Sequence, residues 1–190
     1  MTLLIGALTL GFILSLLALG VFISFRIFDF PDITADGSIT LGAAIAALLL
    51  VKGVNPVVAS VAAFAGGFIA GAVTATLATK FKINRLLAGI LVMTALYSIN
   101  LHIMGKSNVA LFGQRTFSSY AERFGAWILR NQQDLNLLGW PVRATDVSIL
   151  ITAIVIVVFV GLLLYMFFQT NLGAAMRATG NNSQMARALG

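Results

Sequence analysis

Four long apolar segments without a charged side chain constrain this fold more than any other feature. A helix needs about 20 consecutive apolar residues to cross the hydrocarbon core of a bilayer. A spanning helix satisfies its backbone hydrogen bonds internally, so the sequence predicts an all-α, polytopic transmembrane bundle. The four segments are Leu3–Ile23, Pro56–Thr79, Leu86–Met104 and Val147–Phe168.

Composition supports a membrane protein and excludes several other classes. Hydrophobic residues make up 59% of the chain and charged residues 9%, whereas a soluble domain carries about 25% charged residues. The net charge of +6 is confined to loops, which favours anionic membrane lipid over nucleic acid as a partner. With no cysteine and one histidine, we expect no catalytic site, metal or cofactor.

A fifth apolar stretch, Ile39–Val51, is shorter than the other four. As a helix it reaches only roughly 20 Å, which is too short for a hydrocarbon core about 30 Å thick. It is therefore a broken or re-entrant helix, or it recruits the aspartate-rich residues Asp29–Ser38 that precede it. We expect about four full spans plus this short or broken membrane helix.

The helix that begins at Asn55-Pro56 carries a predicted packing feature. Asparagine is a favoured cap, and proline suits the first helical turn. Further along, small residues recur every four positions and let another helix approach closely. These residues are Ala63, Gly67, Gly71 and Ala75.

The orientation follows from the cations between two spans. Lys80, Lys82 and Arg85 lie close together without an acidic residue, which is typical of a cytoplasmic loop. Counting from this loop puts Arg26 at the inner end of the first span and the N-terminus outside. The residues after the last span are then cytoplasmic.

The long polar excursion Lys106–Arg143 contains a predicted amphipathic helix. Aromatic and apolar residues in it are spaced to share one helical face. Such a helix between two spans is expected to lie flat at the membrane interface. The residues of this face are Phe117, Tyr120, Phe124, Trp127 and Ile128.

The last eighteen residues, Gly173–Gly190, are small, polar and basic. Gly180 suits the left-handed residue that ends a short helix, and Asn181 or Asn182 suits the cap of the next. Two short helices at a membrane exit predict a docking element for a soluble partner. Arg177 and Arg187 either face an acidic partner or anchor the segment beside lipid.

Two motifs resemble those of a known family. The terminal pattern resembles the coupling segment of inner-membrane permeases of ABC importers, in the family that includes branched-chain amino acid and ribose-type permeases. Residues 23–38, followed by Leu41-Gly42-Ala43-Ala44, resemble a sub-branch in which some members are similar to importers of tryptophan or tyrosine. The pattern consists of Gly173, Arg177, Ala178, Gly180, Asn181, Ala186, Arg187 and Gly190.

The resemblance implies a translocation subunit rather than an enzyme. Its terminal pattern implies docking to one of a pair of ATP-binding subunits, which hydrolyse the ATP. A second permease copy, identical or different, and a periplasmic or lipid-anchored binding protein complete the implied importer in a bacterial inner membrane. Family permeases continue beyond the coupling segment, so residues 1–170 are expected to be the first part of a permease domain, and residues 171–190 its coupling segment, of a truncated chain.

Polar residues near helix ends are candidates for the substrate pathway. Asp32, Asp36 and Ser38 enter a membrane segment, where acids are costly and functional or paired. Alternatively, Asp36 or Ser38 caps the helix that follows, a position that also attracts a substrate carboxylate. Thr94, Tyr97 and Ser98 line a pathway or bond to a neighbouring helix.

The favoured cargo is a small polar solute, with an amino acid, aromatic or branched-chain, first among them. The alternatives are the same transporter class carrying a simple sugar or nucleoside, and a membrane carrier outside that class. An ion-coupled carrier would need acidic residues within its spans, and the four long segments contain none. Asn100 and His102, near one helix end, are the other polar residues of interest, and His102 is expected to be an interface residue or a structural hydrogen-bonding residue.

Overall fold

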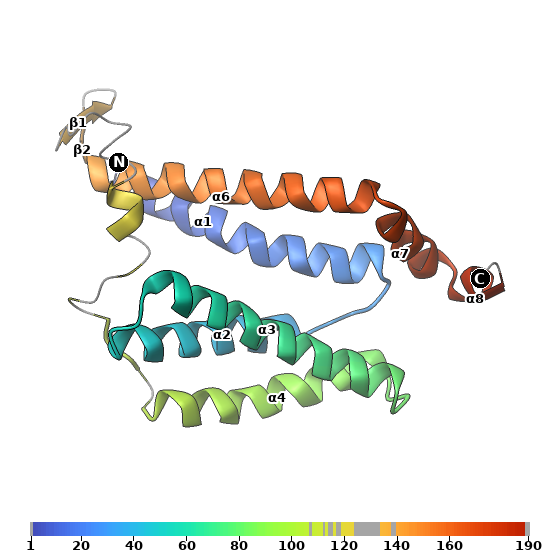
Figure 1. Cartoon of the computed structure of the whole chain (residues 1–190). Helices are drawn as coiled ribbons and strands as arrows, with labels where there is room; N and C mark the ends of the chain where they lie inside the picture. Colours follow the sequence, from blue (N-terminus) through green and yellow to red (C-terminus); the bar gives the residue numbers. More distant parts are fainter. Residues whose placement is uncertain are drawn as a thin grey trace. The chain divides into compact units, whose positions relative to one another are not determined.

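Five long helices form the framework of the protein in the computed structural model, which describes residues 2–106, 108–111, 113, 116, 119–123, 134–137 and 140–188. All five are long and apolar enough to cross a membrane, which confirms the predicted helical, multi-pass class (Figure 1). They are α1 (Thr2–Phe22), which continues as the π-helical turn η1 (Ile23–Ile27), α2 (Thr34–Val51), α3 (Pro56–Thr79), α4 (Arg85–Met104) and α6 (Ala144–Gln169).

Helix α2 is a full candidate span rather than a short or broken one. It begins at Thr34 and contains 18 residues, which at 1.5 Å per residue reach roughly 27 Å. Of the two sequence-based alternatives, the helix therefore recruits the aspartate-rich residues before Ile39. The described residues therefore contain five candidate spans, where the sequence predicted about four and a short or broken helix.

Helix ends follow the capping signals in the sequence. The side chain of Asn55 accepts a hydrogen bond of 2.9 Å from the amide of Val57, with Pro56 in the first turn of α3. Asn84 caps α4 in the same way. Gly53, at a φ of 77°, adopts the left-handed conformation that commonly follows a helix end and that glycine tolerates best.

The segment between α4 and α6 contains strands that the sequence analysis did not predict. Strands β1 (Asp134–Leu137) and β2 (Trp140–Arg143) pair antiparallel, with Asp134 opposite Arg143. The polar and apolar residues of β1 alternate, which is the strand period. Residues 119–123 are helical, in agreement with the helix predicted around Tyr120, while its position at the membrane interface stays a prediction. Phe117, Phe124, Trp127 and Ile128 lie outside the described residues.

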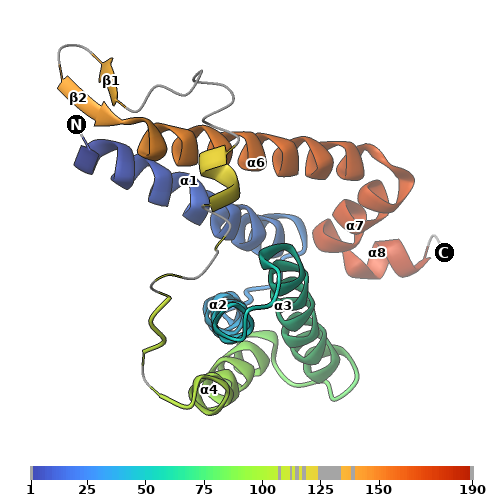
Figure 2. The same cartoon turned by 60° about the vertical axis from the view of Figure 1, so that its left-hand side comes forward.

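The chain divides into two compact units, Val21–Thr116 and Met1–Gly20 with Phe117–Gly190. In the first, which we call the three-helix unit, α2 packs against both α3 and α4 (Figure 2). Its core contains one cluster of buried apolar residues with partly buried ones around it. The buried members are Leu41, Ala70, Val92 and Leu96, and Ile45, Leu77 and Ile103 surround them.

Glycines let α2 and α3 approach closely, but these are not the glycines of the predicted stripe of small residues on α3, which consists of Ala63, Gly67, Gly71 and Ala75. A Cβ atom at Gly66 would overlap the side chain of Ile45, and one at Gly42 would lie 3.6 Å from the carbonyl oxygen of Ala63. At Gly67 and Gly71 it would meet nothing within 4 Å. Within this unit, only Ala63 of the predicted stripe is shown at the contact.

The second unit, which we call the α6 unit, ends in two short helices. These are α7 (Asn171–Asn181) and α8 (Ser183–Ala188). Strand β2 contacts α6, α6 contacts α7, and α7 contacts α8. The predicted pair of short helices after the last span is therefore present.

Candidate functional site

The start of α2 is fixed by Asp32 rather than by the residues expected from sequence. The carboxylate of Asp32 accepts a hydrogen bond of 2.9 Å from the amide of Thr34. The prediction that Asp36 or Ser38 caps this helix was wrong, because α2 begins earlier and both residues lie inside it. Asp36 is exposed, and the hydroxyl of Ser38 donates to the carbonyl of Ala35 at 3.0 Å.

The loop between α1 and α2 is held against the start of α4. Arg85 donates a hydrogen bond of 2.8 Å to the carbonyl oxygen of Asp29, and its guanidinium lies 5.8 Å from the ring centroid of Phe30. Asp29 has a φ of 50°, a left-handed conformation that aspartate tolerates better than most residues. Gly89 allows a close approach of α4 to this loop, because a Cβ atom there would lie 3.2 Å from the amide nitrogen of Ile33.

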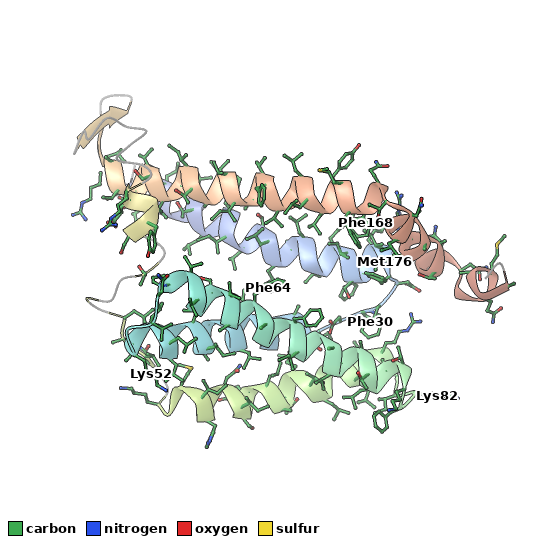
Figure 3. All side chains as sticks on the ribbon, in the orientation of Figure 1. Phe30, Lys52, Phe64, Lys82, Phe168 and Met176 are labelled. Carbon is green, nitrogen blue, oxygen red and sulfur yellow. The ribbon has the colours of Figure 1, made fainter. Side chains whose placement is uncertain are left out.

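Successive loops of the three-helix unit lie at alternate ends of the unit. Figure 3 labels Phe30 and Lys82 at one end of this unit and Lys52 at the other. The contact between Arg85 and Asp29 joins the loop before α2 to the loop before α4. The loop that contains Lys80 and Lys82 therefore shares its end of the unit with the loop that follows Arg26.

Two polar contacts, one buried and one partly buried, join α2 to its neighbours. The hydroxyls of Thr34 and Thr74 lie 2.7 Å apart, and each residue is 1% exposed. Asn100 on α4 donates a hydrogen bond of 2.8 Å to the hydroxyl of Thr40. Its side-chain oxygen is buried and has no partner in the described part of the chain. Inside a membrane such contacts hold helices together where apolar packing alone lacks direction.

The other pathway candidates lie apart from these contacts. Thr94, Tyr97 and Ser98 are all exposed and share one face of α4, as their spacing of three and four residues requires. The hydroxyl of Thr94 donates to the carbonyl of Ile90 within its own helix at 2.7 Å. His102 is also exposed. The structure therefore separates these residues from the polar contacts around α2.

In the α6 unit, the bend between α6 and α7 is built from three residues. The hydroxyl of Thr170 accepts a hydrogen bond of 3.2 Å from the amide of Gly173. A Cβ atom at Gly173 would overlap the backbone of Phe168, so only glycine lets the first turn of α7 come this close. Arg177 donates a hydrogen bond of 2.9 Å to the carbonyl oxygen of Phe168.

The joint between α7 and α8 differs from the sequence prediction at Gly180. That residue is not a left-handed terminus, because α7 continues through it to Asn181. Asn182 caps α8, as one of the two predicted alternatives required: its side chain accepts hydrogen bonds from the amides of Gln184 and Met185 at 3.1 and 3.0 Å.

The predicted docking residues fall into groups of different exposure. Ala178 and Asn181 are exposed, Arg177 is exposed but bonded to α6, and Gly173 is buried. Gly180 and Ala186 are half-buried. The side chain of Arg187 and the whole of Gly190 lie outside the described residues.

A further polar residue, Asp146, was not among the candidate site residues expected from the sequence. It lies in the first turn of α6 and borders an open hollow of about 580 Å³ that Thr2 and Thr9 also line. The sequence feature that could have identified it is the position of an acidic residue at the start of an apolar span. In the described residues, no three or more histidine, cysteine, aspartate or glutamate side chains are grouped to hold a metal ion.

Comparison with known proteins gives one family and two relatives. Residues 3–190 match the family model described as branched-chain amino acid transport system / permease component. A tyrosine transport system permease protein of Clostridioides difficile (strain R20291) is 43% identical over 98% of this chain and 55% of its own length. Uncharacterized protein RP368 of Rickettsia prowazekii (strain Madrid E) is 35% identical over 100% of this chain and 59% of its own length.

The chain spans little more than half the length of these two relatives. No solved structure matches it.

Proposed function

Because the chain belongs to the family of permease components of branched-chain amino acid transport systems, we propose that it is a translocation subunit of an ATP-driven importer. Its cargo in this proposal is an amino acid, with tyrosine or another aromatic amino acid favoured. The observation that carries the choice of cargo is the 43% identity, over 98% of this chain, to a protein described as a tyrosine transport permease.

Energy in this proposal comes from a separate pair of ATP-binding subunits. The segment that would meet one of them is α7 with α8, which directly follows the candidate span α6. Ala178 and Asn181 are exposed there, so a groove on a partner would reach them without unfolding the segment. To pass a movement of the partner on to α6, this segment needs a firm attachment to that helix. The hydrogen bonds of Thr170 and Arg177 support such an attachment.

The proposed orientation puts the N-terminus outside and α7 and α8 in the cytoplasm of a bacterial cell. It rests on the cations Lys80, Lys82 and Arg85 between α3 and α4 and on the excess of lysine and arginine in cytoplasmic loops. Five passes then carry the chain from outside to inside. Arg26 and the loop before α2 lie on the cytoplasmic side in this orientation.

The complete importer would contain a second permease copy and a substrate-binding protein at the outer face. The exposed side of α3 that contains Phe64 and Phe68 is suited to lipid or to another membrane helix, since both are apolar. Asp32, Asp36 and Ser38 remain proposed pathway residues, together with Thr94, Tyr97 and Ser98. Asp32 would combine such a role with capping α2.

The proposal is tested by uptake into proteoliposomes. The chain as it occurs in its host is reconstituted with the ATP-binding subunit and binding protein of neighbouring genes. We expect ATP-dependent uptake of labelled tyrosine that exceeds uptake of leucine and ribose. Uptake of ribose or a nucleoside alone would contradict the amino acid cargo, and uptake that does not require ATP would contradict the importer class.

A further inference from the structure

We propose that Arg177 is a positioning residue, which holds α7 at a set angle to the end of α6, and that the partner-facing side of α7 is the one that contains Ala178. This inference deepens the proposed function and rests on it for the identity of the partner. The positioning of α7 by Arg177 is a property of the chain alone.

The first observation is how the end of α6 satisfies its backbone. The last four carbonyl groups of a helix have no partner within it and need one elsewhere. The carbonyl of Phe167 accepts from both the amide and the hydroxyl of Thr170, at 3.0 and 2.6 Å. The carbonyl of Phe168 accepts from Arg177 at 2.9 Å. A guanidinium at this position also complements the negative end of the helix dipole.

The second observation is the steric fit at Gly173. Gly173 and Arg177 lie four residues apart in α7 and therefore on the same face. A Cβ atom at Gly173 would overlap the backbone of Phe168, the residue whose carbonyl Arg177 binds. The close approach of Gly173 and the hydrogen bond of Arg177 therefore involve the same residue of α6, Phe168, and come from two successive turns of α7.

The third observation is the division of α7 into two sides. Gly173 is buried, and Met176 and Gly180 are half-buried, with the spacing of one helical side. Figure 3 labels Phe168 and Met176 at this bend. On the remaining surface, Ala175 and Ala178 are exposed, so short side chains leave the backbone of α7 open to a partner.

Different residues of the coupling segment therefore have different roles in this proposal. Arg177 and Gly173 set the direction of α7, so that a displacement of α7 is passed to α6 instead of being lost in the bend. Ala178 and its exposed neighbours meet the partner. The hydrogen bond to Phe168 fixes the position of the Arg177 guanidinium beside the end of α6.

A distance measurement on the chain without any partner tests this assignment. The sequence contains no cysteine, so Val155→Cys on α6 and Ala175→Cys on α7 introduce two unique labelling sites at exposed positions. Pulsed electron paramagnetic resonance in lipid nanodiscs then reports the distance between the two spin labels. We expect one narrow distance peak, its loss in Arg177→Ala, and its recovery in Arg177→Lys, whose ammonium group also donates to a carbonyl.

The matched control is Arg143→Ala, which removes the same charge from the opposite end of α6 and should leave the peak unchanged. A peak that is already broad in the parent, or one that is unchanged in Arg177→Ala, overturns the assignment. In the second case, loss of ATP-binding-subunit capture by Arg177→Ala would assign the arginine to the partner interface. Because the distance measurement uses no partner, it stands even if the uptake experiment refutes the proposed function.

Discussion

The side-chain amide of Asn100 on α4 lies 2.8 Å from the hydroxyl of Thr40 on α2 and donates a hydrogen bond to it. The hydroxyl of Thr40 in turn donates to the carbonyl of Gly37 at 2.8 Å. Two helices that are far apart in the sequence are thereby joined by one polar chain. This polar chain adds a directional link to the apolar packing of the three-helix unit.

The link between Asn100 and Thr40 predicts coupled stability effects. We expect Asn100→Ala and Thr40→Ala each to lower the free energy of unfolding, with a coupling energy of about 0.6–1.7 kcal/mol between them. A double-mutant cycle in bicelles, followed by a steric-trap or denaturant assay, measures this energy. Additive effects of the two substitutions would show that the hydrogen bond does not join the helices.

The contact between α2 and α3 predicts opposite outcomes at two adjacent glycines. Gly66→Val drives a branched side chain into Ile45 and should destabilise the fold by about 1–3 kcal/mol. Gly67→Val enters open space and should change the free energy of unfolding of the single chain by less than about 1 kcal/mol. Unfolding of the two variants in detergent provides the comparison. Equal destabilisation would contradict the packing of α3.

The start of α2 predicts different roles for two aspartates. Asp32→Ala removes the acceptor for the amide of Thr34 and should cost about 0.5–2 kcal/mol, while Asp32→Asn keeps a suitable acceptor and most of the stability. Asp36→Ala, at an exposed position, should change stability by less than about 0.5 kcal/mol. Unfolding and uptake are measured on the same preparations.

The uptake results then decide whether Asp36 is a pathway residue. A stable Asp36→Ala protein that no longer imports would support that role. If this variant keeps both stability and uptake, Asp36 has neither of the roles expected from sequence. A large loss of stability would contradict the exposed position described above.

The exposed side of α7 predicts a steric effect on partner binding. Ala178→Trp should abolish capture of the ATP-binding subunit, because a large ring would fill the space that an exposed alanine leaves for the partner backbone. Ala178→Ser adds a single oxygen and serves as the matched control, with capture close to the parent. Pull-down from detergent extracts measures both. Undiminished capture by Ala178→Trp would place the docking surface elsewhere.

Much of the local structure was predictable, because it depends on short-range signals. Asn55-Pro56 indicated the start of α3, and the apolar run to Thr79 indicated its end. The start of α2 was left open by the sequence, which allowed either a short helix from Ile39 or a helix that recruits the polar residues before it. Thr34 and Asp36 are polar, but the buried hydroxyl contact of Thr34 with Thr74 and the cap from Asp32 let the helix begin among them.

The candidate site was less predictable, because its contacts join distant segments. Arg177 is part of a recognisable pattern, yet its hydrogen bond to Phe168 depends on the angle between α6 and α7. Asn100 was recognised only as a polar residue near a helix end, and nothing in the sequence identified Thr40 as its acceptor. Gly180 appeared suited to a helix terminus, whereas α7 extends through it.

The sequence by itself identified four of the five helices of the described residues that are long and apolar enough to cross a membrane, where most of them begin and end, and which loops carry positive charge. These properties follow from the length of apolar runs relative to the bilayer and from local capping. Only the tertiary structure decided that Gly66 rather than Gly67 meets α2. The physical reason is that lipid tails are as apolar as leucine, so a helix that is hydrophobic on all sides carries no pattern that separates its packed face from its lipid face.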